Sequence, residues 1–154
     1  MVMAWRFGAV DADAVMAVVA TAELFGDWMV GVPVPVHMDH RWPESGSIVR
    51  KDTDREPRGK HAYDRHLTVA VVESWKPPQE LVLRLRSGLG GWVRVTIRLQ
   101  SRPGGCLVEV RADPMSATAL LRYAGPARSR AEERCVMVAE SLIRLAAESS
   151  TGRA

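Results

Sequence analysis

The chain has 154 residues, which is the size of one domain with a substantial core, so we expect a single domain over residues 1–154. Apolar residues make up 47% of it, and 21 basic residues nearly balance 18 acidic ones. This composition argues against disorder, and against a dedicated nucleic-acid binder with its charge gathered on one face. No run of about 18 apolar residues occurs, so the sequence predicts no transmembrane span, and we expect a cytoplasmic protein.

The first thirty residues predict a strand followed by two short helices. Residues 5–10 are a short segment typical of a strand. Asp11 is a good N-cap residue for a helix over 14–20, and Thr21 can cap a second helix over 22–29. A glycine and a proline then end the helical pattern.

The middle of the chain changes to a rhythm of strands and turns. Residues 93–99 show the clearest pattern, in which Val, Ile and Leu alternate with Arg and Thr. A period of two means that one face of the strand is buried and the other is wet. A charged stretch over 51–60 is interpreted as a loop. Other segments with extended or strand character are 32–42, 47–51, 67–75, 81–86 and 106–110.

A long helix is expected after Pro126, following a loop with a helical turn at 117–121. Apolar and small residues there recur at spacings of four, three, four and three, which places them on one helical face. They are Ala131, Cys135, Val138, Leu142 and Leu145.

The two cysteines, Cys106 and Cys135, lie in apolar stretches outside any Cys-x-x-Cys pair. Two buried thiols in a reducing compartment are the simpler interpretation, although the sequence does not exclude a disulfide.

Together these elements predict an α+β fold with a curved antiparallel sheet of six to seven strands. The apolar face of such a sheet must be covered, and the C-terminal helix is the only element long enough to do so. The helical stripe includes small residues, so we expect helix and sheet to leave a space between them, which is the usual setting for an apolar ligand.

Four segments, at 9–15, 25–29, 42–47 and 72–81, carry a family resemblance. In order and spacing they resemble the START-related helix-grip superfamily (SRPBCC), in its polyketide cyclase/dehydrase and lipid transport branch. The resemblance implies a sheet wrapped around the C-terminal helix and a cavity for lipids, polyketides, hormones or other hydrophobic molecules. Some members are cyclases and others bind or carry, and no fixed catalytic motif maps onto this chain.

The leading hypothesis is therefore a carrier or sensor that binds a hydrophobic small molecule between the sheet and the C-terminal helix. A tryptophan and an adaptable methionine end the second short helix, where the short helices are expected to meet the pocket mouth. The expected ligand-binding residues are Trp28, Met29, Val69, Val71, Leu83, Leu85, Val93, Val95, Val108, Met115, Cys135, Val138 and Leu142.

Two other functions stay open. A polyketide cyclase or dehydratase, acting as a lyase or isomerase in the same cavity, would need a polar group there, and His66, Tyr63 and Tyr123 are the candidates. A regulatory module would instead bind a partner protein through its sheet edge or exposed tryptophans. The sequence also leaves a homodimer open.

No cofactor, metal or nucleic acid is expected as a partner. His37 and His40 are three residues apart on an extended segment, so their side chains point to opposite faces and cannot readily share an ion. A phosphate-binding loop is followed by a Lys-Ser/Thr pair and a helix, but the glycines at 88–91 lack that pair and lead into an expected strand. The basic residues around 50–65 alternate with acidic ones.

Overall fold

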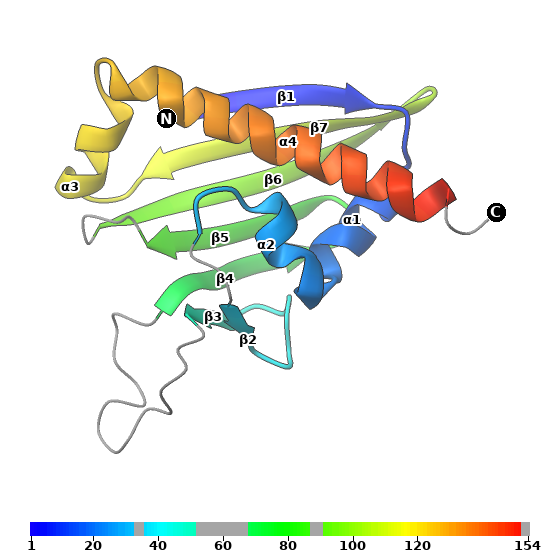
Figure 1. Cartoon of the computed structure of the whole chain (residues 1–154), viewed down its shortest axis with the longest axis horizontal. Coiled ribbons are helices and arrows are strands. Elements are labelled where there is room, and N and C mark those ends of the chain that lie inside the picture. Colours follow the sequence, from blue (N-terminus) through cyan, green and yellow to red (C-terminus); the bar gives the residue numbers. More distant parts are fainter. Residues whose placement is uncertain (33–35, 52–67, 87–90, 152–154) are drawn as a thin grey trace.

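A computed structural model describes residues 1–32, 36–51, 68–86 and 91–151 of the chain (Figure 1). The elements in chain order are β1 (Val2–Gly8), α1 (Ala12–Ala20), the 3-10 turn η1 (Ala22–Leu24), α2 (Phe25–Trp28), β2 (Val36–Met38), β3 (Ile48–Lys51), β4 (Thr68–Lys76), β5 (Glu80–Arg86), β6 (Trp92–Arg102), β7 (Gly105–Pro114), α3 (Ala117–Leu120), the 3-10 turn η4 (Leu121–Tyr123) and α4 (Ala127–Thr151).

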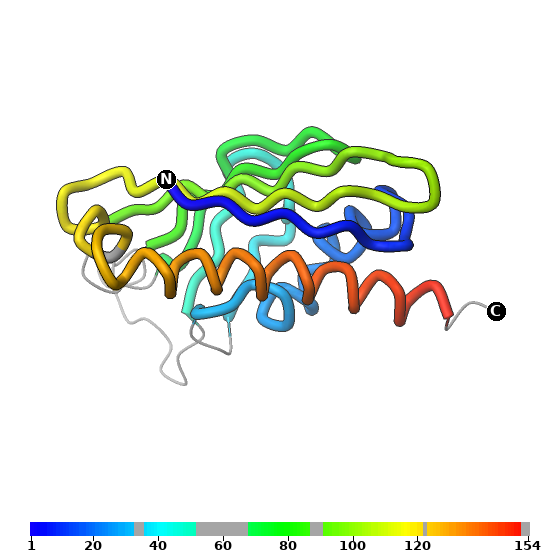
Figure 2. Tube along the Cα trace, turned by 90° about the horizontal axis from the view of Figure 1, so that it is seen from above, coloured from blue at the N-terminus to red at the C-terminus, as the bar shows by residue number. Residues whose placement is uncertain are grey.

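The described strands form one antiparallel sheet in the order β1-β7-β6-β5-β4-β3-β2. Each strand from β2 to β6 pairs with the next one along the chain, whereas β1 pairs with the free side of β7. The sheet curves, and the helices lie on one side of it (Figure 2). The expected α+β fold, with two short helices after the first strand and one long C-terminal helix, is confirmed.

The pairing of β1 begins earlier than residue 5, where the sequence pattern starts. Val2 pairs with Ala112 and Ala4 pairs with Val110, and all four side chains are buried. Their burial depends on β7, which lies a hundred residues away in the chain, so local patterning does not reveal it.

The extended stretch expected over 32–42 is shorter in the structure. Among the residues described there, only those of β2 form a strand, and a turn follows in which the backbone N–H of Arg41 donates to the carboxylate of Asp39 at 3.0 Å. Residues 33–35 lie outside the described part of the chain, as do 52–67, which contain most of the charged loop.

Helix α4 buries the predicted stripe, including Ala131, Cys135, Val138, Leu142 and Leu145, and continues to Thr151. It packs against β1 and α1 most extensively, and also against β7 and α2. The expectation that α4 alone covers the sheet is therefore wrong, because the two short helices share that role (Figure 1). Among the described helices, none is long and apolar enough to span a membrane.

Candidate functional site

The inner face of the sheet, which faces the helices, is not sealed equally along its length. At one end of the paired strands, Leu81 and Ile97 have no exposed surface. Further along β6, Val95 is 6% exposed and Val93 is 5% exposed, and Leu85, the partner of Val93 on β5, is half-buried. Leu83, the partner of Val95, has no exposed surface, and Leu99, beyond Ile97, is 4% exposed, so the slight exposure belongs to individual side chains of this face.

The buried face of α4 is also sealed unevenly. Ala139 and Leu142 have no exposed surface and Ala131 is 1% exposed, whereas Cys135 and Val138 are each 4% exposed and Leu145, nearer the C-terminus, is 9% exposed. In Figure 1 the N-terminal half of α4 lies towards the end of the sheet where β5 finishes and β6 starts. The slightly exposed pairs Cys135 and Val138 on the helix and Val93 and Val95 on the sheet thus lie towards the same end of the molecule.

Aromatic residues from α2 and the turn before β3 border the interior. Phe25 packs edge-to-face against Trp28 at 5.2 Å and against Trp42 at 5.3 Å between ring centroids. Trp42 donates its indole N–H to the carbonyl of Val19 at 3.0 Å, but the buried indole N–H of Trp28 has no acceptor among the described residues. An unpaired buried donor is unfavourable, and an acceptor on a bound molecule would relieve this cost if it reached the Trp28 indole.

Both thiols are free and buried, in agreement with the sequence interpretation. Burial raises the pKa of the Cys135 thiol to about 11 and also raises the pKa of Cys106. A thiol held in its neutral form is a weak nucleophile, so the environment of Cys135 suits apolar contact better than covalent catalysis.

Most residues expected to bind a ligand belong to the buried core. Those in the core are Trp28, Met29, Val69, Leu83, Val93, Val95, Val108, Cys135, Val138 and Leu142, with Leu85 packed against them.

Two of the expected ligand-binding residues lie elsewhere. Val71 is on the outer face of the sheet, because its neighbours Ala70 and Val72 take the inner positions and it pairs with Arg84. Met115 follows β7 and is 42% exposed.

Of the three candidate catalytic residues, the structure describes one. His66 and Tyr63 lie outside the described residues. Tyr123, in η4, is half-buried and packs against the core, and η4 contacts α4.

The histidines of the β2 region sit in a polar surface setting. His37 and His40 are exposed and line a surface hollow of about 280 Å³ together with Asp39 and Arg50. The described residues contain no group of three or more side chains that could hold a metal ion.

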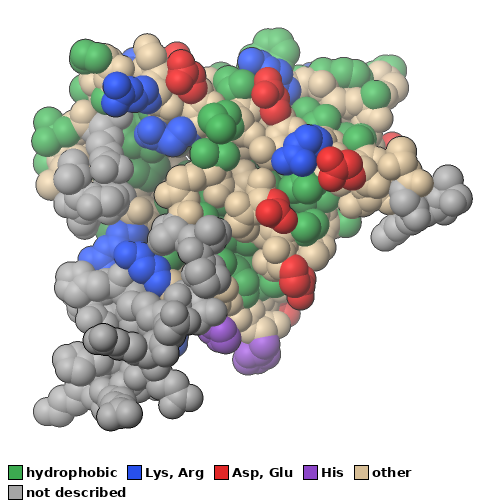
Figure 3. All heavy atoms as spheres, viewed as in Figure 1, with side chains coloured by type: hydrophobic (Ala, Val, Ile, Leu, Met, Phe, Trp, Pro, Cys, Tyr) green, Lys and Arg blue, Asp and Glu red, His purple; other side chains and the backbone are tan. Residues whose placement is uncertain are grey.

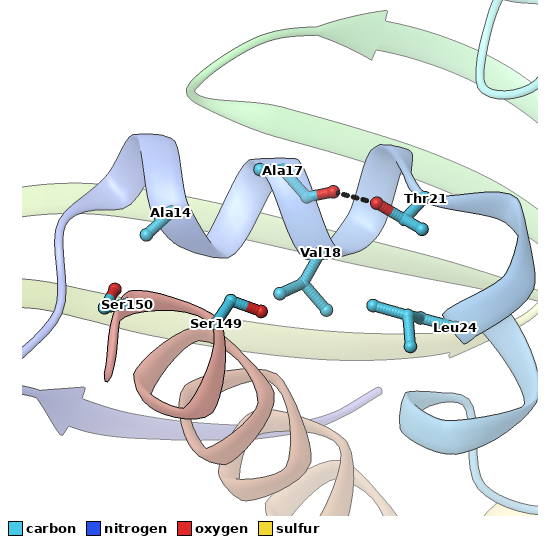
Figure 4. Close-up of a pocket in the computed structure, with 7 residues that line it drawn as sticks. All are labelled: Ala14, Ala17, Val18, Thr21, Leu24, Ser149 and Ser150. Atoms are coloured by element: carbon cyan, nitrogen blue, oxygen red, sulfur yellow. Dashed lines mark hydrogen bonds between the residues drawn. The ribbon is translucent and has the colours of Figure 1, made fainter. Parts of the chain in front are cut away.

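Two further hollows lie on the surface, away from the inner face of the sheet. One of about 560 Å³ borders the turn between β4 and β5. The other, of about 120 Å³, lies between α1 and the end of α4 (Figure 4), where Thr21 and Ser149 donate their hydroxyls to the backbone carbonyls of Ala17 and Leu145. Since these hydroxyls are already bonded within their own helices, this small hollow presents little to a polar ligand.

Charges on the helix-covered side are mixed in sign. Figure 3 shows basic and acidic side chains interspersed over this face. Two ion pairs lie along α4, Arg128 with Glu132 at 3.1 Å and Arg144 with Glu148 at 3.4 Å. This arrangement differs from the single-sign stripe that binds a phosphate backbone.

Comparison with known proteins places the fold among solved structures. A scan of family models and a search of curated proteins find no match for this sequence. The protein MLL2253 from Mesorhizobium loti has a similar structure, with a TM-score of 0.65 and 14% identity over 94% of each chain.

Two other similar structures come from biosynthetic pathways. DynU16, from the dynemicin biosynthetic locus, matches with a TM-score of 0.63 and 16% identity over 93% of this chain and 45% of its own. The di-domain ARO/CYC StfQ, from the steffimycin biosynthetic pathway, matches with a TM-score of 0.58 and 17% identity over 97% of this chain and 51% of its own. The chain spans about half the length of these two proteins, and what it shares with them is the fold.

Proposed function

We propose that the chain is a single ligand-binding domain of the START-related helix-grip type, which binds a hydrophobic small molecule as a carrier or sensor. The ligand lies between the inner face of the sheet around Val93 and Val95 and the N-terminal half of α4 around Cys135 and Val138. The observation that carries this proposal is the residual exposure, 4–6% each, of these four apolar side chains on the sheet and on α4.

The chemistry of the lining defines the ligand class. The side chains there are aliphatic or a neutral thiol, so the body of the ligand is apolar. The unpaired indole N–H of Trp28 adds one hydrogen-bond donor. A carbonyl or similar acceptor on the ligand would relieve the unfavourable burial of that donor. The best candidate is therefore a mostly apolar molecule with one acceptor, such as a lipid or a polyketide.

Displacement of a fluorescent fatty acid, with native mass spectrometry of the purified protein, tests the proposal. Val95→Phe fills the space proposed for the ligand and should weaken binding by about tenfold or more, whereas Thr96→Phe adds the same ring on the outer face and should not. Absence of any uptake by the wild-type chain, or equal losses in the two variants, would reject binding at this place.

A cyclase or dehydratase acting on a polyketide is the second candidate, and Tyr123 is the observation that favours it. This hydroxyl-bearing side chain is half-buried on a turn that packs against α4, so it can reach a ligand held beside that helix. Tyr123→Phe should then abolish turnover of an aromatic polyketide while leaving ligand uptake unchanged. No turnover by the wild-type chain would exclude this candidate and leave binding intact.

A further inference from the structure

The strand β1 has an apolar outer side that is left uncovered. Met3, Trp5 and Phe7 alternate along the strand on the face turned away from α4, and they are 43%, 57% and 51% exposed. Met1, 56% exposed, continues the same side. Large apolar side chains in a contiguous row on a protein surface mark an interaction site.

The same strand is an open edge of the sheet. It pairs with β7 on one side only, with no register shift along its length, and among the described strands none pairs with the other side. Alternate residues of a strand direct N–H and C=O to the same side. The carbonyl of Trp5 accepts a bond from the exposed Arg6 guanidinium at 2.9 Å, which shows that Trp5, and with it Met3 and Phe7, directs its backbone to the open edge.

Edge strands in monomeric proteins are usually blunted by lysines, prolines or bulges. β1 contains none of these. Its one charged residue, Arg6, lies between Glu140 of α4, at 3.5 Å, and the carbonyl of Trp5, so a strand added to this edge must take that carbonyl over from the Arg6 guanidinium. We infer that β1 is a docking strand for a second copy of this chain, which adds its own β1 antiparallel to form a twofold symmetric dimer with a continuous sheet.

The sequence of β1 is complementary to itself in that arrangement. With Trp5 on the twofold axis, it faces Trp5 of the second copy, and Met3 faces Phe7. All of these residues direct their backbone groups to the shared edge, so the facing residues exchange N–H and C=O bonds. Their side chains meet on the outer face as aromatic and apolar cross-strand pairs.

The charges on α4 fit the same axis. β1 and α4 run in the same general direction, and the ion pair between Arg6 and Glu140 sets them side by side (Figure 1). Arg6 lies level with Glu140, and Trp5 lies one strand residue before it, a shift of about 3.3 Å. The same shift along a helix is about two residues, so the twofold axis through Trp5 passes α4 between Met137 and Glu140. Two antiparallel copies of α4 then bring the exposed Glu133 of one opposite the exposed Arg144 of the other.

Light scattering after gel filtration tests the dimer. At about 50 µM the wild-type chain should have twice its 17.0 kDa mass. Trp5→Lys blunts the edge and should raise the dimer Kd by about thirtyfold or more. Gln100→Lys, a matched lysine on the outer face two strands away, should leave the dimer unchanged. If Trp5→Lys fails to fold, Met3→Lys makes the same test.

A charge exchange tests the pairing of the helices. Glu133→Arg and Arg144→Glu should each raise the dimer Kd by about three- to tenfold, and the double variant should return it to within about twofold of wild type. A wild-type chain that is monomeric at about 200 µM, or an equal loss in Gln100→Lys and Trp5→Lys, would overturn the dimer. A double variant no tighter than the single ones would overturn the assigned axis.

Discussion

The indole N–H of Trp42 donates to the carbonyl of Val19 at 3.0 Å, in a buried contact between the turn that precedes β3 and the last turn of α1. Phe25 of α2 packs edge-to-face on the same indole. Trp42 therefore connects both short helices to the turn that precedes β3, near the edge of the sheet opposite to β1. This anchoring lets α1 and α2 share with α4 the covering of the inner face.

Loss of that bond should destabilise the fold. Trp42→Phe keeps an aromatic ring but leaves the carbonyl of Val19 buried without a donor, so we expect the free energy of unfolding to fall by about 1–3 kcal/mol. Trp75→Phe is the matched control, because Trp75 is half-buried on β4 and its indole N–H, unlike that of Trp42, makes no hydrogen bond within the described part of the chain. Urea denaturation of the two variants measures the difference, and equal losses would argue against a structural role for the bond.

Close approach of β1 to α4 predicts a second sensitive position. A Cβ atom at Gly8 would lie 2.7 Å from Cγ2 of Ile143, well inside contact distance. Gly8→Ala should therefore lower the free energy of unfolding by about 1–3 kcal/mol, as overpacking does elsewhere. Combining it with Ile143→Ala, which makes room, should cost less than the sum of the single changes. Strictly additive losses would show that the two residues do not meet.

The thiol of Cys135 predicts a pH dependence. Burial raises its pKa from 9.0 in the unfolded chain to about 11 in the folded one, so the folded state holds the proton more tightly. The stability that this group contributes is complete below about pH 9 and is lost as the pH rises through the folded pKa. Thermal unfolding across this window should show a steeper decline for wild type than for Cys135→Ala. Some decline persists in the variant, because the pKa of Cys106 is raised as well. Identical declines of stability with pH in the wild-type chain and in Cys135→Ala would contradict a raised pKa at Cys135.

Trp28 predicts a preference among ligands. If its unpaired indole N–H bonds to the ligand, a long-chain methyl ketone should bind about five- to tenfold more tightly than the alkane of equal length. Trp28→Phe should remove this preference, even though the smaller ring also weakens packing for both ligands. Calorimetric titration of the ketone and the alkane into the wild-type chain and into the variant measures the four affinities. A ketone preference that survives in the variant would assign the donor to another group.

Element types and their order could be predicted from the sequence because the periodicities are strong. The alternation in β6 and the helical stripe from Ala131 to Leu145 correspond to surfaces that the structure buries. Both patterns reflect local geometry, with side chains repeating every two residues in a strand and every three to four in a helix.

The facing of individual residues was harder to predict. The run Val69–Val72 is apolar throughout, so alternation cannot tell that Val71 faces outward. The pairing of β4 also shifts register twice, which further changes which residues face the helices. One shift, in its pairing with β3, lies between Val49 and Arg50, and the other, in its pairing with β5, lies between Val72 and Ser74. The bond from Trp42 to Val19 and the open edge at β1 depend on tertiary pairing, which no local pattern encodes.

Photoaffinity labelling with a diazirine-bearing fatty acid, mapped by peptide mass spectrometry, tests ligand binding beside α4 most directly. Labels should fall on β5 and β6 near Leu85 and Val93 and on α4 near Cys135, and an excess of unlabelled fatty acid should suppress them. Labelling confined to the small hollow around Ser149, or spread evenly over the surface without competition, would contradict a site between the sheet and the N-terminal half of α4.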